Sequence, residues 1–255
     1  MNNTCVAGAT DMVFYQREGC AVSLPYEKYN SGDYLTNNIS WHNEDSPWKA
    51  KCVFELLKDN NVSPQSICEV GCGAGGVLGE LRNVMPHVQL TGYDIASDAT
   101  KFWGQYQNRN IDFQLGDFFI LNMKTYDVIL VLDVVEHVPN PFDFIHKLKG
   151  AANYYLFHFP LDLCALTVLR ERPILLAREK VGHINYFTKN LALSLIKECG
   201  LEIVDWRYSG AGLNLPNRQL KTILASFPRR LGYELNKDLA VRALGGETLY
   251  ILAKG

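Results

Sequence analysis

Apolar and polar positions follow two rhythms that succeed each other from about residue 47 onward. Short runs rich in β-branched and aromatic residues indicate strands, and stretches with apolar residues every three or four positions indicate helices. The predicted strands cover residues 66–70, 88–93, 111–115, 126–132, 154–159, 201–207 and 247–253. The predicted helices cover residues 47–58, 77–84, 97–107 and 141–149, with a further one between Thr188 and Gly200.

Local end signals support two of these helices. Ser46 precedes Pro47, which places an N-cap before proline at the first helical position. Thr188 is the expected N-cap of the later helix, and Gly200 is its expected C′ residue. Because strands separated by helices form parallel sheets with right-handed crossovers, we predict an α/β fold. The continuous apolar run at 126–132 is typical of a strand buried on both faces.

Two segments interrupt the alternation, at about 160–187 and about 208–246. Both are insertions beside strand ends, where substrate-binding elements are usually found. Residues 1–46 are polar and irregular, so we expect an N-terminal extension followed by one domain at 47–255. No internal repeat is found in the sequence.

The composition is that of a globular protein. Apolar residues make up 47% of the 255 residues and charged residues 20%, which excludes disordered and low-complexity classes. The most apolar stretch, 154–169, is interrupted by His158, Pro160 and Asp162, so no membrane span is expected. No signal peptide is recognised at the N-terminus. The seven cysteines are scattered, with one close pair at Cys68 and Cys72, which favours reduced thiols in the cytoplasm.

Charge is unevenly distributed along the chain. Residues 1–150 hold 18 acids and 11 bases, whereas residues 151–255 hold 9 acids and 14 bases. The stretch from Trp206 to Arg230, most of it in the second insertion, holds five bases and no acids: Arg207, Arg218, Lys221, Arg229 and Arg230. A smaller group lies in the first: Arg170, Arg172, Arg178 and Lys180. These bases favour an anionic substrate, with Arg170 and Arg218 as candidate contacts, although a solvated helix face would give the same pattern. The net charge of −2 argues against nucleic acid as a partner.

A glycine-rich loop at 69–76 follows the first strand and precedes a helix. Gly71, Gly73 and Gly76 satisfy the dinucleotide fingerprint, so an NAD-dependent oxidoreductase is one hypothesis. Glu69, two residues before the first glycine, is poorly suited to a pyrophosphate and suits a cationic amino-acid sulfonium. Asp94 ends the next strand, where a carboxylate can bind ribose hydroxyls.

A second acidic position follows the third strand. Asp117 can accept a hydrogen bond from an adenine amino group while Phe118 covers the ring. Both Asp94 and Asp117 have an alternative, purely structural interpretation as caps of the helices that follow them.

Four ordered stretches resemble class I S-adenosylmethionine-dependent methyltransferases: 67–76, 91–94, 115–118 and 126–141. The last is similar to the small-molecule branch that includes ubiquinone- and menaquinone-type enzymes. The overall pattern also looks similar to methyltransferases associated with surface polysaccharides. The resemblance implies a doubly wound, seven-stranded, mostly parallel sheet whose last strand is antiparallel. A dehydrogenase would normally continue into a second parallel half, which the pattern lacks.

The resemblance implies S-adenosylmethionine as the cofactor and assigns its binding residues. The first motif contributes Glu69, Gly71, Cys72, Gly73 and Gly75; the ribose and adenine positions are Asp94, Ile95, Asp117 and Phe118; Asp133 lies near the sulfonium. Relatives use an N-terminal segment as a lid, which here corresponds to residues 29–48. Trp41 and Trp48 are candidates to contact the cofactor, and Tyr34 and His42 to contact the substrate. The alternative is a surface brace.

Three histidines are candidates for catalysis, because a hydroxyl acceptor needs a general base. His137 follows the fourth strand, and its alternative role is local hydrogen bonding and helix capping. His158 alternates with Phe157 and Phe159 and is also compatible with a core histidine. His183 precedes the helix capped by Thr188, where relatives often carry a histidine near the substrate pocket.

The spacing of Asp133, Glu136 and His137 is compatible with metal binding. Metal-dependent relatives use a different acid cluster, however, so no metal is expected.

These features predict a cytoplasmic methyltransferase, monomeric or homodimeric, that acts on a small molecule. The expected reaction is O-methylation of an anionic metabolite or glycoconjugate, such as a nucleotide-sugar or a surface-polysaccharide precursor. Three alternatives stay open: a quinone or other lipid acceptor, an NAD-dependent oxidoreductase, and a non-catalytic module that keeps the cofactor fold.

Overall fold

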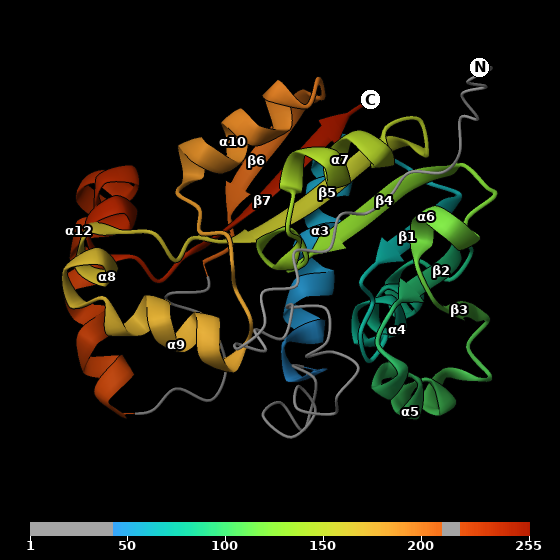
Figure 1. Cartoon of the computed structure of the whole chain (residues 1–255), viewed down its shortest axis with the longest axis horizontal. Helices are drawn as coiled ribbons and strands as arrows, with labels where there is room; N and C mark the ends of the chain where they lie inside the picture. The colour runs from blue at the N-terminus through green and yellow to red at the C-terminus, as the bar shows by residue number, and fades with distance from the viewer. Residues whose placement is uncertain (1–42, 211–219) are drawn as a thin grey trace, which may run out of the picture.

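A computed structural model describes residues 43–210 and 220–255 of the chain as a single twisted sheet with helices on both faces (Figure 1). The seven strands follow the order β3-β2-β1-β4-β5-β7-β6. β7 is antiparallel to both neighbours, and the other pairs are parallel. The strands are β1 (Ser66–Val70), β2 (Gln89–Asp94), β3 (Ile111–Leu115), β4 (Tyr126–Leu132), β5 (Ala152–Pro160), β6 (Glu202–Tyr208) and β7 (Thr248–Lys254). The predicted α/β fold with an antiparallel last strand is confirmed.

Helices connect most of these strands. The longer ones are α3 (Ser46–Asp59), α4 (Gly76–Val84), α7 (Pro141–Leu148), α8 (Ala165–Arg170), α9 (Arg172–Lys180), α10 (Lys189–Glu198) and α12 (Leu220–Leu244). Shorter pieces are η1 (Asn43–Asp45), η2 (Ser97–Ala99), α5 (Thr100–Trp103), η3 (Gly104–Tyr106), α6 (Phe118–Leu121) and η4 (Val135–His137). The single helix predicted over 97–107 is thus three short pieces, the last of which begins at Gly104.

The end signals in the sequence act as predicted in α10. The hydroxyl of Thr188 accepts a hydrogen bond from Leu191 N at 3.3 Å, and Gly200 adopts a positive φ of 75°. α7 begins in the same manner, because Asn140 accepts from Asp143 N at 3.2 Å ahead of Pro141. These caps satisfy backbone groups that the helix itself leaves unpaired.

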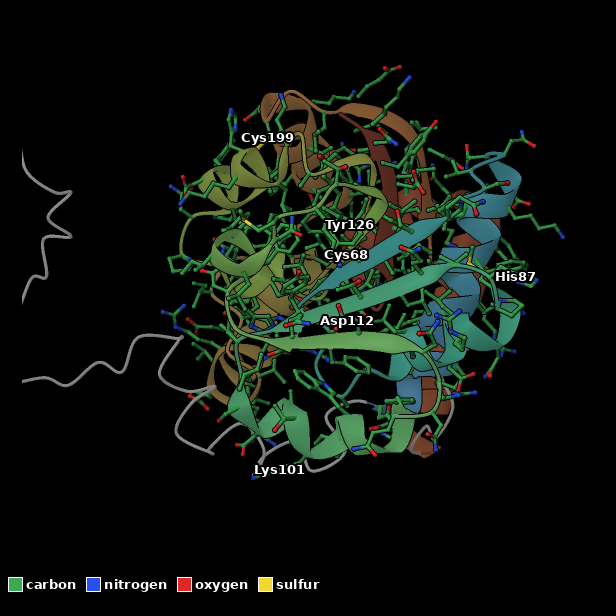
Figure 2. All side chains as sticks on the ribbon, turned by 90° about the vertical axis from the view of Figure 1, so that its right-hand side faces the viewer. Cys68, His87, Lys101, Asp112, Tyr126 and Cys199 are labelled. Carbon is green, nitrogen blue, oxygen red and sulfur yellow. The ribbon has the colours of Figure 1, made fainter. Side chains whose placement is uncertain are left out.

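The core consists of two layers, one on each face of the sheet. One face packs against α3 and α4, and the other packs against α7 and α10. β4 contributes to both layers, as its continuous apolar run predicts. Cys68 and Tyr126 lie in this interior, whereas His87 and Lys101 lie at the periphery (Figure 2).

The two insertions form helices at one end of the sheet. α8 and α9 belong to the first, and α12 belongs to the second and packs against α8 (Figure 1). In the described part of the chain, no helix is both long enough and apolar enough to cross a membrane. The cysteines described there, at positions 52, 68, 72, 164 and 199, are free thiols.

The order of the strands reverses between β1 and β4, since the chain runs outward to β3 before it returns to β4. At such a switch point the loops leave in opposite directions and open a crevice beyond the carboxyl ends of the strands. The glycine-rich loop follows β1 and the segment of Asp133 follows β4, so both meet at this crevice.

Candidate active site

A cavity of about 340 Å³ lies at this switch point. Its walls come from the first turn of α3, the glycine-rich loop, the segment after β4, the end of β5 and the segment after α9. Predicted site residues that line it are Trp48, Glu69, Gly71, Cys72, Gly73, Asp133, His137, His158 and His183. Segments far apart in the sequence therefore build one site.

The glycine-rich loop is fastened to β2. Gly71 N and Cys72 N both donate to the carbonyl of Tyr93, at 2.8 and 3.0 Å. Gly71 has a φ of 78°, and a Cβ there would lie 2.5 Å from Cγ2 of Val134, so glycine is needed for both conformation and space. The indole of Trp103 donates to Gly73 O at 2.9 Å and supports the loop from outside.

Asp94 joins the loop to the end of β2. One carboxylate oxygen accepts from Gly73 N at 2.7 Å and the other from Ala96 N at 2.8 Å. Burial raises the pKa of this carboxyl, although the hydrogen bonds from Ala96 and Gly73 oppose the shift. Asp94 therefore holds the loop in place, and each oxygen keeps a further lone pair for another donor.

Glu69 lies at the base of the cavity and is only 3% exposed. Its Oε2 has no hydrogen-bond partner. Burial raises the pKa of this carboxyl to about 8, against the opposing charge of Lys49. A buried acceptor without a donor is costly, so this position is suited to a cationic donor group.

Asp133 is the first residue after β4 and adopts a φ of 54°, which is uncommon outside glycine. Its Oδ2 lies 2.6 Å from Lys49 Nζ, and its Oδ1 lies 2.6 Å from His158 Nδ1. Burial opposes its charge, yet His158 and Lys49 hold the pKa of the Asp133 carboxyl well below its usual range. The strained backbone thus places a carboxylate between two cation-forming groups.

His158 lines the cavity but has both ring nitrogens engaged. Nδ1 faces Asp133, and Nε2 lies 2.6 Å from the hydroxyl of Thr248. The side chain is 2% exposed and packs against Tyr250. This geometry fits the alternative interpretation as a core histidine, one that positions Asp133, better than it fits a general base.

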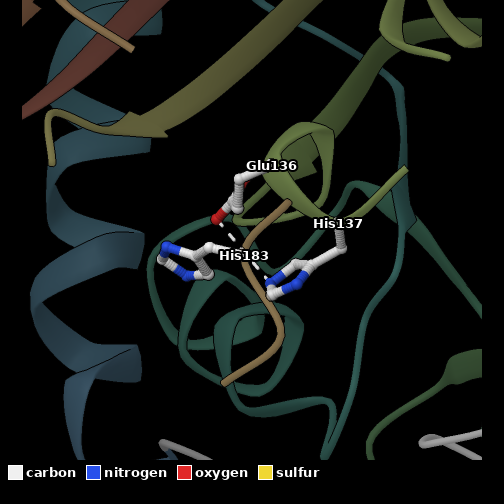
Figure 3. Close-up of side chains that lie close together, drawn as sticks. All are labelled: Glu136, His137 and His183. Carbon is white, nitrogen blue, oxygen red and sulfur yellow. Dashed lines mark ion pairs between the residues drawn. The ribbon is translucent and has the colours of Figure 1, made fainter. Parts of the chain in front are cut away.

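His137 and His183 lie close to Glu136, and all three side chains line the cavity (Figure 3). Their ring centroids are 5.0 Å apart, and Nε2 of His137 lies 3.9 Å from Oε1 of Glu136. Burial lowers the pKa of His137 to about 4, and the neighbouring His183 adds to this shift. The Nδ1 of His183 lies 2.6 Å from Oδ2 of Asp162. This arrangement presents two imidazoles and a buried carboxyl to the same space.

Several predicted site residues do not line the cavity. Asp117 is exposed and caps α6 by accepting from Phe119 N at 2.8 Å, as its structural interpretation states. Phe118 is 4% exposed and packs edge-on against Tyr93, so the expectation that it covers an adenine ring does not fit its position. The positions that also lie off the cavity are Gly75, Asp94, Ile95 and Arg170.

One base of the charge pattern has acidic partners within the fold. The guanidinium of Arg207 pairs with Asp59 at 2.6 Å and with Asp205 at 2.8 Å. The predictions for Tyr34, Trp41, His42 and Arg218 lie outside the described residues.

Sequence reasoning missed two important residues. Lys49 lies in the first turn of α3, next to the predicted Trp48, and nothing in its local pattern indicated that it would reach Asp133. Asp162 lies at the start of the first insertion and orients His183. In the sequence, only its position in the predicted insertion indicated that Asp162 could lie near the site.

Comparison with known proteins decides the family. Residues 40–205 match the family described as a methyltransferase domain. The chain belongs to this methyltransferase family. The resemblance to methyltransferases drawn from the four motifs is thereby confirmed. This assignment decides against the NAD-dependent alternative.

Curated relatives of this methyltransferase match only part of its length. A ubiquinone biosynthesis O-methyltransferase from Glaesserella parasuis is 30% identical over 103 residues, covering 36% of this chain and 43% of that protein. A tRNA U34 carboxymethyltransferase from Campylobacter concisus is 25% identical over 138 residues, covering 52% and 46%. The chain thus spans less than half the length of these relatives.

Solved structures share the fold over most of the methyltransferase. The plantazolicin methyltransferase BpumL in complex with S-adenosylhomocysteine aligns with a TM-score of 0.60 at 16% identity, over 91% of this chain and 94% of that chain. The N-methyltransferase NodS from Bradyrhizobium japonicum aligns with a TM-score of 0.56 at 15% identity, over 91% and 99%.

Proposed function

We propose that this protein transfers the methyl group of S-adenosylmethionine to an oxygen atom of a small anionic metabolite or glycoconjugate in the cytoplasm. A nucleotide-sugar or a surface-polysaccharide precursor has the required chemistry. One observation carries the proposal: a single cavity is lined both by the glycine-rich loop with Glu69 and by the cluster of Glu136, His137 and His183. Such a cavity has a cofactor end and an acceptor end.

The cofactor end fits the methionine and ribose parts of S-adenosylmethionine. Oε2 of Glu69 can accept from the ammonium group, which would satisfy its buried oxygen. Asp94 does not itself line the cavity, but it accepts a hydrogen bond from Gly73 of the cavity wall, and a remaining lone pair can accept from a ribose hydroxyl. Lys49 can pair with the cofactor's carboxylate. When bound, S-adenosylmethionine supplies a methyl group on a positively charged sulfur.

The acceptor end supplies groups that activate a hydroxyl. A neutral hydroxyl must lose its proton as it is methylated, and imidazoles on the cavity wall can promote this loss. The partly buried rings of His137 and His183 place such groups on the cavity wall. We therefore assign O-methylation rather than methylation of carbon.

Exposed bases beside the entrance support an anionic acceptor. Arg178 and Lys180 are exposed on α9, and the chain continues from there directly into Val181 and His183 on the cavity wall. A positive rim of this kind attracts phosphates or carboxylates. The ubiquinone-type relatives favour a second candidate, a quinone precursor with a free phenolic hydroxyl.

The first test is calorimetric titration with S-adenosylhomocysteine, with NADH and NADPH in parallel. We expect micromolar binding of the first compound alone. Incubation with labelled S-adenosylmethionine and a panel of nucleotide-sugars, phosphorylated glycans and quinone precursors then identifies the acceptor by mass spectrometry. Methylation of carbon or nitrogen, or no transfer to any acceptor while S-adenosylhomocysteine binds, would count against the proposal. Transfer to the quinone precursors alone would favour the second candidate.

A further inference from the structure

The carboxyl group of Glu136 has surroundings that its fold does not explain. Glu136 lines the cavity and is fully buried, and neither of its side-chain oxygens has a hydrogen-bond partner. An unsatisfied buried carboxyl is unfavourable unless another group compensates for it. Its backbone carbonyl, by contrast, is well used, because it accepts from Ile184 N at 2.9 Å and Asn185 N at 3.0 Å. These two bonds hold the segment that contains His183 against Glu136.

Both neighbouring histidines are oriented by their Nδ1 atoms. Nδ1 of His137 lies 3.1 Å from the carbonyl of Gly182, and because a carbonyl only accepts, Nδ1 is the donor. Nδ1 of His183 donates in the same manner to the carboxylate of Asp162 at 2.6 Å. In a neutral imidazole this leaves Nε2 as the lone-pair atom. Metal-binding histidines are oriented by this type of second contact, to a backbone carbonyl or a carboxylate.

The three side chains offer ligand atoms to one point. One atom each from Glu136, His137 and His183 lies within 4.8 Å of the others (Figure 3). Around a tetrahedral Zn²⁺ ion such atoms are about 3.4 Å apart, so modest side-chain rotation would complete the geometry. Two imidazoles and one carboxylate are a donor set that divalent transition metals prefer, with positions left open for substrate.

We propose that Glu136, His137 and His183 bind a divalent transition-metal cation such as Zn²⁺ at the acceptor end of the cavity. From the sequence, the candidate ligands were Asp133, Glu136 and His137, and no metal was expected because metal-dependent relatives use a different acid cluster. The structure instead directs Asp133 to Lys49 and His158 and supplies the third ligand from the segment after α9.

The role of the cation rests on the proposed function, whereas its binding does not. With the metal bound, His137 and His183 act as its ligands and no longer as bases. An open coordination position would instead take the acceptor's hydroxyl oxygen and lower the pKa of the hydroxyl. The hydroxyl proton then passes to solvent water, the oxygen forms a bond to the methyl carbon, and the carbon–sulfur bond breaks with its electron pair left on sulfur. This assigns the acceptor class more narrowly, to molecules whose hydroxyl can chelate together with a neighbouring oxygen.

The test is metal binding by the full-length protein after treatment with a chelator. Zn²⁺ is titrated by calorimetry, and Co²⁺ is titrated by its visible absorption, which reports nitrogen and carboxylate ligands at a site of low coordination number. We expect one equivalent of each metal. Glu136→Gln and His183→Asn should each weaken Zn²⁺ binding more than ~100-fold, and Asp162→Asn by ~10–100-fold as loss of an orienting contact. His87→Ala, at an exposed histidine, is the matched control and should bind as the parent does.

Binding of S-adenosylhomocysteine, measured on every variant, separates the possible failures. A protein that binds S-adenosylhomocysteine but takes up no Zn²⁺ or Co²⁺ would overturn the metal site and leave the methyltransferase proposal intact. If Zn²⁺ binding is unchanged in Glu136→Gln and His183→Asn, the metal binds elsewhere, and the proposed site is overturned as well. If the parent protein itself does not bind S-adenosylhomocysteine, that result would instead contradict the proposed function.

Discussion

Lys49 and Asp133 are 84 positions apart in the sequence, yet Nζ of the first lies 2.6 Å from Oδ2 of the second. This ion pair joins the first turn of α3 to the loop after β4 on the wall of the cavity. It also neutralises a carboxylate that lies close to the predicted position of the sulfonium. The pair therefore connects the stability of the fold to the electrostatics of the cofactor site.

The variant Lys49→Met should destabilise the protein by about 2–4 kcal/mol. Breaking a fully buried pair costs about 3–5 kcal/mol, and the 31% exposure of the Asp133 side chain reduces that cost. Denaturation by urea at pH 7 measures the change. Lys51→Met is the control, since its pair with Glu55 is exposed and should contribute less than about 0.5 kcal/mol. Equal effects of the two substitutions would show that the Lys49 pair is not a structural link.

Glu69 should make the cofactor-free protein less stable as pH rises. Its carboxyl has a pKa of about 8 in the fold against an ordinary 4.5, so between these values the unfolded chain releases a proton that the folded chain keeps. Stability then falls with pH by up to about 1.4 kcal/mol per unit across this window. Glu69→Gln should remove that dependence, which makes the variant the more stable protein at pH 9 and equal to the parent near pH 4. Parallel stability profiles of the two proteins would contradict the assignment.

Asp94→Asn should weaken binding of S-adenosylhomocysteine by ~10–150-fold, the equivalent of about 1.5–3 kcal/mol for bonds to a charged group. Asparagine keeps a single acceptor oxygen, so it cannot accept from both Gly73 N and Ala96 N, and the glycine-rich loop also loses a support. Calorimetry gives the affinity, and thermal denaturation gives the stability. Asp112→Asn on β3 is an exposed control. Unchanged affinity in Asp94→Asn would exclude a ribose contact.

Gly71→Ala should be strongly destabilising, by about 2 kcal/mol or more. The substitution combines a positive φ with a Cβ that would lie 2.5 Å from Val134. Adding Val134→Ala should relieve the steric part and leave about 1 kcal/mol of backbone strain. Gly104→Ala is the matched control, because a Cβ there meets no atom within 4 Å and φ is −54°. A double variant no more stable than Gly71→Ala alone would show that packing against Val134 is not the constraint.

Much of the fold could be read from local patterns. The strands, the caps of α10 and the turn of the glycine-rich loop depend on residues within a few positions of one another, and alternation of apolar residues records which face is buried. The run at 126–132 predicted β4, the strand at the centre of both core layers. Glu69, Gly71 and Asp94 were found for the same reason, since each is tied to the end of a predicted strand.

The partners of the chemically active side chains could not be found in this way. Phe118 follows an acid at the end of a strand, which is compatible with contact to a base, and only packing against Tyr93 shows that its ring belongs to the core. The sequence made His158 a candidate catalytic residue. Only the positions of Asp133 and Thr248 show that both of its ring nitrogens already have partners.

The sequence by itself determined the order of the elements, the glycine-rich loop and the family, because these depend on short-range periodicity and on fixed spacings. Tertiary structure alone decided that Lys49 pairs with Asp133 and that His183 joins Glu136 and His137. Parallel crossovers bring the carboxyl ends of distant strands to one edge of the sheet, and the direction of each side chain there depends on packing around it. The spacing of residues along the chain does not determine those side-chain directions.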